Sequence, residues 1–105
     1  MNALLFAVLV ALAPTAGAQS PPPQAAVRIK DFAYAPARLT VPAGTTVRFV
    51  NDDTEAHTVT AVDRSFDSGG LDSGESWTHR FAAPGTFAYF CAIHPYMHGT
   101  VVVTK

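Results

Sequence analysis

Three residues near the end of the sequence carry side chains that bind soft metal ions, and they are evenly spaced. Cys91, His94 and Met97 follow one another at intervals of three in the run C-A-I-H-P-Y-M. They place a thiolate, an imidazole and a thioether on one short loop. Two imidazoles and a thiolate with a weakly bound thioether suit copper that cycles between Cu(I) and Cu(II). The spacing therefore predicts a copper site that needs one more histidine.

His57 is the favoured second imidazole. It follows the polar stretch 51–56 and starts a strand-like run, and loops at the end of a β-sandwich commonly carry function. Two other histidines compete for the role. His79 lies in the middle of a predicted strand. His98 directly follows Met97, so His98 and Met97 would crowd each other at one ion. We therefore expect His57 to complete the site.

The single cysteine has an alternative interpretation as a buried, inert residue. It cannot form an internal disulfide, because Cys91 is the only cysteine of the chain, and a free thiol in an exported protein needs an explanation. Met97, taken alone, is equally well an apolar residue that closes the loop. Zinc also accepts cysteine and histidine, but a closed site with methionine favours copper. Asn51 is a candidate for an outer contact that ties the His57 loop to the loop after Cys91.

The N-terminal region is typical of an export signal. Residues 3–13 form an apolar run that is too short to span a membrane, and Ala16, Gly17 and Ala18 fit the small-residue cleavage pattern. We expect 1–18 to be a signal peptide that is cleaved after Ala18. Residues 19–26 are rich in proline and are expected to form an extended, poorly ordered lead-in, followed by one small domain over 27–105.

The rest of the chain has the pattern of an all-β domain. Short β-branched and aromatic stretches are separated by Gly, Pro, Asn and Asp, which predicts a sandwich or a barrel. The segment 63–72 is polar and is expected to hold a turn or a short helix. The predicted strands are 27–30, 38–41, 45–50, 57–62, 76–81, 85–91 and 100–104.

Composition excludes nucleic acid as a partner and gives no sign of a membrane span after signal cleavage. The formal net charge is −1, and the 7 Lys and Arg residues are scattered along the chain rather than gathered in a basic stripe. An enzyme is disfavoured, because catalysis would need substrate access and usually a second metal.

Several segments resemble one known family. Y-F-C-A-I-H-P-Y-M-H-G-T-V-V-V looks like the copper loop and final strand of the cupredoxins, in the short form typical of amicyanins, and V-N-D-D-T-E-A-H-T-V resembles their Asn-to-His stretch. The resemblance covers residues 27–105. It implies an eight-stranded Greek-key β-sandwich with one type 1 copper ion. It also implies that His57, Cys91 and His94 are the strong ligands and Met97 the axial ligand, and it supports Asn51 as the loop-tying residue.

The expected function is that of a small blue copper protein in the periplasm. We expect a monomer that shuttles single electrons between transient redox partners, such as a dehydrogenase or a c-type cytochrome. The electron would pass through the exposed edge of His94, within a small apolar patch around Pro95 and Tyr96. The low net charge argues against strong electrostatic steering. The alternative is a periplasmic protein that carries or sequesters copper.

Overall fold

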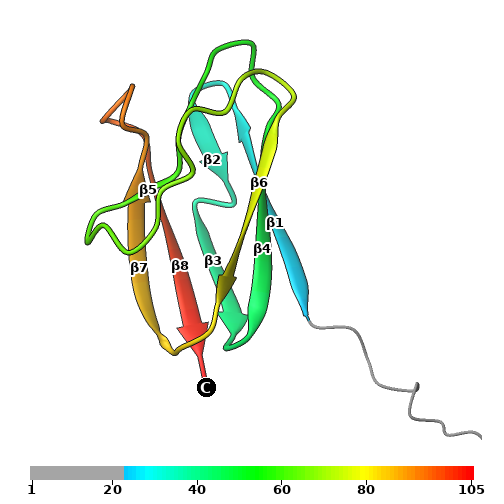
Figure 1. Cartoon of the computed structure of the whole chain (residues 1–105), viewed down its shortest axis with the longest axis vertical. Helices are drawn as coiled ribbons and strands as arrows, with labels where there is room; N and C mark the ends of the chain where they lie inside the picture. Colours follow the sequence, from blue (N-terminus) through cyan, green and yellow to red (C-terminus); the bar gives the residue numbers. More distant parts are fainter. Residues whose placement is uncertain (1–22) are drawn as a thin grey trace, which may run out of the picture.

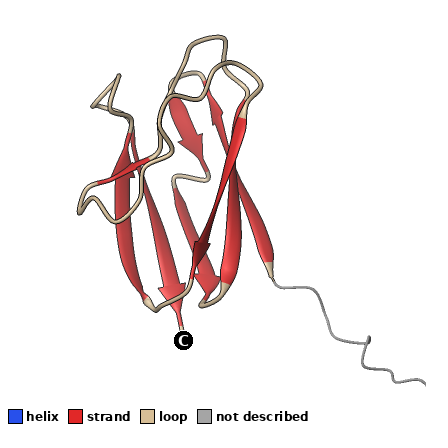
Figure 2. Ribbon diagram, in the orientation of Figure 1, coloured by secondary structure: helices blue, strands red, loops and turns tan. Residues whose placement is uncertain are grey.

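The fold is a sandwich of two four-stranded sheets (Figures 1 and 2). The computed structural model describes residues 23–105, and this part of the chain contains no helix, so none in it is long and apolar enough to cross a membrane. The first sheet has the order β2 (Ala33–Ala35), β1 (Gln24–Lys30), β4 (Thr45–Asn51), β6 (Ser76–Phe81). The second has the order β3 (Arg38–Pro42), β8 (His98–Thr104), β7 (Gly85–Phe90), β5 (Thr60–Ala61).

Strand pairing joins segments that are distant in the sequence. β1 runs parallel to β4, and β3 runs parallel to β8, whereas the other pairs are antiparallel. From β3 to β7 each strand lies in the opposite sheet from the one before it. The chain therefore crosses repeatedly between the layers, as in Greek-key sandwiches, and the prediction of an all-β sandwich is confirmed.

Alternation along the strands explains why the core lies between the sheets. In β4, Val47 and Phe49 are fully buried while Arg48 between them is exposed, because successive side chains of a strand point to opposite faces. In β8 of the other sheet, Val101 and Val103 are buried, while Val102 between them is half-buried. Burying these side chains removes apolar surface from water, which is the main favourable term in folding.

Tyr89 of β7 packs directly against Gly99 of β8. The two residues are paired across the strands, and a Cβ atom built on Gly99 would lie 2.3 Å from the Tyr89 side chain. Only glycine leaves room for the aromatic ring at this position. Tyr89 is fully buried and packs edge-on against Tyr34 and Phe49. This contact fixes the start of β8 directly after the predicted metal loop.

The structure corrects several predicted boundaries. β1 begins at Gln24, ahead of the expected boundary at Val27, so residues 24–26, which were expected in an extended, poorly ordered lead-in, belong to a strand that pairs with β4. Within the predicted strand 57–62 only β5, Thr60–Ala61, is regular, and 63–72 holds turns and isolated bridges but no helix. The three-residue strand β2 was not predicted. The predicted signal peptide, 1–18, lies outside the described residues.

The loops that carry the predicted ligands meet at one end of the sandwich. The β4–β5 loop (green in Figure 1), the β1–β2 turn and the β7–β8 loop (orange) lie at the end opposite to residue 105. Both sheets contribute to this end, because β4 belongs to the first sheet and β7 to the second. The sandwich thus brings residues 51–59 next to residues 91–97.

Candidate metal centre

Three of the predicted ligands form one compact cluster. One donor atom each of His57, Cys91 and His94 lies within 4.8 Å of the other two. The Cys91 Sγ atom is 3.7 Å from Nδ1 of His57 and 3.7 Å from Nδ1 of His94, and the two Nδ1 atoms are 3.3 Å apart. Donor atoms that bind one ion at about 2.0–2.3 Å are themselves roughly 3–4 Å apart. The spacing of the three atoms therefore fits a single ion.

Cys91 enters the cluster directly after β7 and is fully buried. Its Sγ atom accepts a hydrogen bond from the backbone N–H of Thr58 at 3.3 Å. Burial alone would raise the pKa of the thiol, but the hydrogen bond from the Thr58 N–H and the adjacent His57 and His94 lower it to about 6. A thiol with a lowered pKa is readily converted to the thiolate, which is the form that binds a metal.

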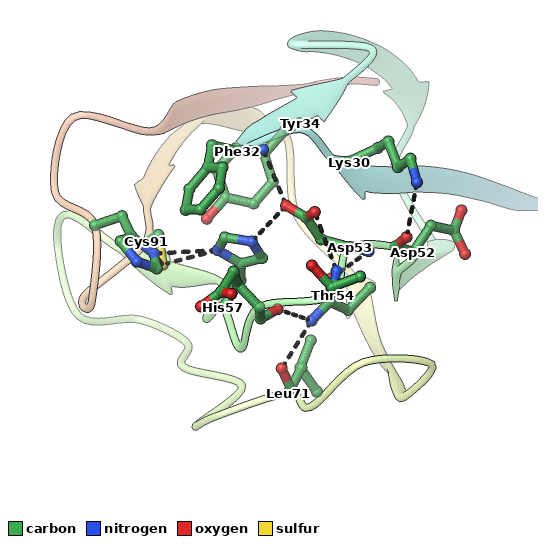
Figure 3. A network of polar contacts seen from close by, with 12 residues as sticks. Lys30, Phe32, Tyr34, Asp52, Asp53, Thr54, His57, Leu71 and Cys91 are labelled. Carbon is green, nitrogen blue, oxygen red and sulfur yellow. Dashed lines mark hydrogen bonds and ion pairs between the residues drawn. The ribbon is translucent and has the colours of Figure 1, made fainter.

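The His57 ring is held from the side that faces away from the cluster. Its Nε2 atom lies 2.9 Å from Oδ2 of Asp53 (Figure 3). The Phe32 amide and then the His57 ring keep the pKa of Asp53 below its usual value, so the carboxylate stays charged. A carboxylate on the second nitrogen of a histidine fixes which ring nitrogen is free to bind a metal. The free atom is Nδ1, which points toward Cys91.

The backbone around His57 is also fixed. The His57 N–H donates to the carbonyl of Leu71 at 3.0 Å, and the Leu71 N–H donates back to the His57 carbonyl at 2.7 Å. The ring itself is fully buried. His57 is therefore held by its backbone, its ring nitrogen and its packing together.

The other two predicted ligands lie on a loop that closes on itself. The His94 N–H donates to the Cys91 carbonyl at 3.2 Å, and the Met97 N–H donates to the His94 carbonyl at 2.9 Å. The Cys91 N–H donates to the Met97 carbonyl at 3.2 Å, which completes the loop. Met97 is buried with the core residues, whereas His94 is half-buried. The loop thus presents one ligand candidate inward and another toward solvent.

Thr58 joins the His57 segment to this loop, a connection that was not predicted from the sequence. Besides its N–H bond to Cys91, its Oγ1 atom accepts a hydrogen bond from the Ala92 N–H at 2.8 Å. Asn51, which was expected to make this connection, does not make it. Its amide donates to the carbonyls of Glu55 and Leu71 at 2.8 and 2.9 Å. The position of Thr58, directly after the predicted ligand His57, was the available signal.

Asn51 instead organises the His57 side of the site. Its Oδ1 atom accepts the Asp53 N–H at 2.9 Å, so the same side chain positions the residue that holds the His57 ring. Fully buried amides need such partners, and Asn51 is fully buried. Two residues therefore share the role that was expected of Asn51. Asn51 orders the His57 segment itself, and Thr58 connects this segment to the loop after Cys91.

The two competing histidines lie outside the cluster. His79 packs in a group of aromatic rings with Phe66, Trp77 and Phe81, and burial lowers its pKa. His98 is exposed at the start of β8. Neither residue belongs to the group of donors around Cys91.

Comparison with known proteins decides the family. The sequence matches the family model of the cupredoxin-like domain over residues 2–103. The chain belongs to the cupredoxin-like family. Amicyanin-alpha from Methylorubrum extorquens is 30% identical to this cupredoxin, and the match covers 98% of this chain and 99% of the relative.

Two solved structures resemble the cupredoxin sandwich described above. A purple cupredoxin from Nitrosopumilus maritimus has a TM-score of 0.74 at 31% identity, and the match covers 76% of this chain and 99% of that one. A copper-containing nitrite reductase from Thermus scotoductus has a TM-score of 0.76 at 33% identity, and the match covers 90% of this chain but 25% of the reductase. The same sandwich therefore occurs alone and as one part of a larger enzyme.

The donor set of this cupredoxin fits one type 1 copper ion. Two imidazole nitrogens and a thiolate of lowered pKa converge at ligand spacing, and Met97 lies at the end of the same short loop. Soft sulfur donors combined with imidazoles are the ligands that copper prefers, and a weak axial thioether is typical of electron-transfer sites. The cofactor that matches this site is a single copper ion.

Proposed function

We propose that this cupredoxin is a small exported electron carrier with His57, Cys91 and His94 as strong copper ligands and Met97 as the weak axial ligand. The observation that carries the proposal is the convergence of two Nδ1 atoms and one Sγ atom between 3.3 and 3.7 Å apart. When bound, copper would supply a centre that gains and loses one electron.

The protein contributes a site whose ligands are positioned by bonds that do not involve the metal. Asp53 holds the His57 ring, and Thr58 holds both the Cys91 sulfur and the Ala92 amide. Groups that are already fixed need little rearrangement when the charge at the site changes, as electrostatic preorganisation requires. Such a site is suited to electron transfer.

The path to a partner is proposed to lead through His94. Its ring is half-buried, while the His57 ring is fully buried. Ile93 and Tyr96 flank it on the loop and are 50% and 67% exposed, and Phe32 contributes a third exposed apolar side chain beside it. We call these three residues and His94 the His94 patch. A small apolar patch suits a transient encounter that buries less than about 1,200 Å².

The partners proposed for this patch are redox proteins, a dehydrogenase on one side and a c-type cytochrome on the other. The net charge of −1 gives little long-range steering, so apolar contact would dominate the encounter. We further propose that the protein acts as a monomer in the periplasm after cleavage of residues 1–18. The match to the nitrite reductase covers only 25% of that chain, which is too little to transfer its catalytic activity to this protein. We therefore propose electron transfer and not catalysis.

The proposal is tested by adding Cu(II) to the purified protein and recording its visible spectrum. An intense thiolate-to-copper band that disappears on reduction and returns on oxidation is expected. Cys91→Ser should abolish the band, because serine does not supply the soft anionic sulfur. Thr40→Ser, a change at an exposed strand position, is the control and should leave the band intact. Absence of the band in the unmodified protein would contradict the proposal.

A second measurement separates electron transfer from copper delivery. Repeated reduction and oxidation in the presence of a Cu(I) chelator should leave the copper in place if the protein carries electrons. Rapid loss of copper to the chelator in each reduced period would instead favour the copper carrier. The spectrum and the chelator assay together therefore distinguish the two functions.

A further inference from the structure

In the turn between β1 and β2, Phe32 has a backbone conformation that bulky residues rarely adopt. Lys30 and Ala33 are paired, so Asp31 and Phe32 form a two-residue hairpin loop. Both have positive φ, 52° and 58°, as the type I′ hairpin turn requires. The second position of that turn is normally glycine, and asparagine and aspartate are the side chains that best tolerate positive φ. A bulky residue such as Phe32 is an outlier there.

The Phe32 ring contacts both histidines of the site. Its centroid lies 5.2 Å from that of His57 with an angle of 88° between the planes, and 4.9 Å from that of His94 with an angle of 84°. Edge-to-face pairs at such distances are favourable arrangements of aromatic rings. Figure 3 shows the Phe32 ring beside His57 and the Phe32 backbone N–H directed at Asp53.

The Phe32 backbone takes part in the same arrangement. Its N–H donates to Oδ2 of Asp53 at 3.0 Å, and this oxygen also lies 2.9 Å from Nε2 of His57. The strained turn therefore reaches His57 twice, through the carboxylate and through the aromatic ring. It reaches His94 through the ring alone.

Core packing does not account for a phenylalanine at this position. The side chain is 37% exposed and does not belong to the buried cluster between the sheets. Glycine would satisfy the turn without strain, and a backbone N–H of any residue but proline would serve Asp53. What phenylalanine adds is the contact with two imidazoles that come from different loops. Strain that the rest of the fold does not need is commonly stored at functional sites.

We propose that Phe32 is a positioning residue that clamps the His57 and His94 rings together in the metal-binding arrangement, before the ion binds and while it stays bound. The inference rests on the proposed function, because it concerns the same site. The clamp acts mainly on His94, since His57 is already held by Asp53 and by its backbone bonds to Leu71. It restricts rotation of a half-buried ring whose other aromatic contacts are the His57 ring, at 5.0 Å, and the more distant Tyr96, at 6.2 Å.

The test uses Phe32→Gly, which removes the ring and relieves the turn. Because glycine is preferred at this position, the metal-free variant should fold, with a Tm at or above that of the unmodified protein. Its Cu(I), measured by transfer to a chelator in excess, should leave about tenfold faster, since loss of an outer contact to a ligand commonly weakens metal binding by at least that factor. A Tm that does not fall, together with faster copper release, is the signature of a positioning role.

Tyr96→Ala is the matched control, because it removes an exposed aromatic residue of the same patch that contacts His94 alone. Its Cu(I) release should stay near the rate of the unmodified protein. Equal acceleration in both variants would show that any apolar cover suffices and would overturn the clamp. A lowered Tm of metal-free Phe32→Gly would assign Phe32 to hairpin stability and would overturn it as well.

A metal-free measurement keeps the inference separate from the proposed function. In the NMR spectrum of the copper-free protein, the ring signals of His94 should broaden or double in Phe32→Gly, while those of His57 change less. Ring signals as sharp as those of the unmodified protein, or an unchanged rate of copper release, overturn the clamp. If the unmodified protein takes up no copper, the proposed function fails and the NMR result alone decides on Phe32.

Discussion

The two histidines of the site lie in contrasting surroundings. His57 is fully buried, and its ring, its N–H and its carbonyl all have partners within the framework. His94 is half-buried, and its backbone bonds are made within the loop 91–97. One half of the site is therefore fixed by the sandwich, and the other half is fixed by a loop that is closed on itself.

This difference shows how a small domain can build a site that is both rigid and accessible. The buried half sets the geometry, while the loop half reaches solvent. The two halves are joined by few contacts, chiefly Thr58 to Cys91 and Ala92, and Phe32 to both histidines. Disturbing the framework should therefore affect both halves, whereas disturbing a single tie should affect one.

The largest effect is expected from Gly99→Ala, which disturbs the framework beneath the loop. The new Cβ atom would lie 2.3 Å from the Tyr89 side chain, and neither the paired strands nor the fully buried ring can move away freely. Overpacking of this kind should lower the free energy of unfolding by about 3 kcal/mol. Urea denaturation of the metal-free protein measures the loss. Gly70→Ala is the control, because its Cβ would meet nothing within 4 Å, and equal stability of the two variants would contradict the prediction.

A smaller effect, confined to the fixed half, is expected from Asp53→Ala. The change removes the carboxylate that holds Nε2 of His57 and the N–H of Phe32. Copper affinity, measured by competition with a chelator, should fall by about 10- to 100-fold, as is usual when such an outer contact to a ligand is lost. The neighbouring Asp52→Ala removes an exposed ion pair with Arg28 and should leave the affinity unchanged. Equal affinities of both variants would mean that packing alone orients His57.

The smallest effect is expected from Thr58→Val, which breaks one tie between the halves. Valine keeps the shape and the backbone N–H bond to Cys91 but loses the oxygen that accepts the Ala92 N–H. The free energy of unfolding should fall by about 1 kcal/mol. Hydrogen exchange at the Ala92 amide should become faster, while exchange at His57 should not change. Unaltered exchange at Ala92 would show that the loop needs no tie to the His57 segment.

The sequence predicted the regular strands of the sandwich better than the contacts between its loops. Strands such as 45–50 and 76–81 were predictable because alternation is a local signal. β2 and the irregular course of 57–62 were not, since short pairings depend on partners elsewhere in the chain. The four candidate ligands followed from residue type and spacing, and three of them converge in the structure.

The partners of the ligands were harder to predict. Asn51 was assigned to the wrong connection, because an amide gives no sign in the sequence of which carbonyls it will reach. Thr58 and Asp53 were missed for the same reason. Phe32 was missed because a positive φ cannot be seen in a residue type that normally avoids it.

The parallel pairing of β3 with β8 has a consequence for when the protein can capture a metal. β8 follows the loop 91–97 in the chain and lies between β3 and β7 in its sheet. Pairings this remote in sequence form late in folding, because loop closure must come first. Until β8 has paired, the loop that carries Cys91 and His94 is not held beside His57, so copper uptake by the folding protein would report that β8 is in place.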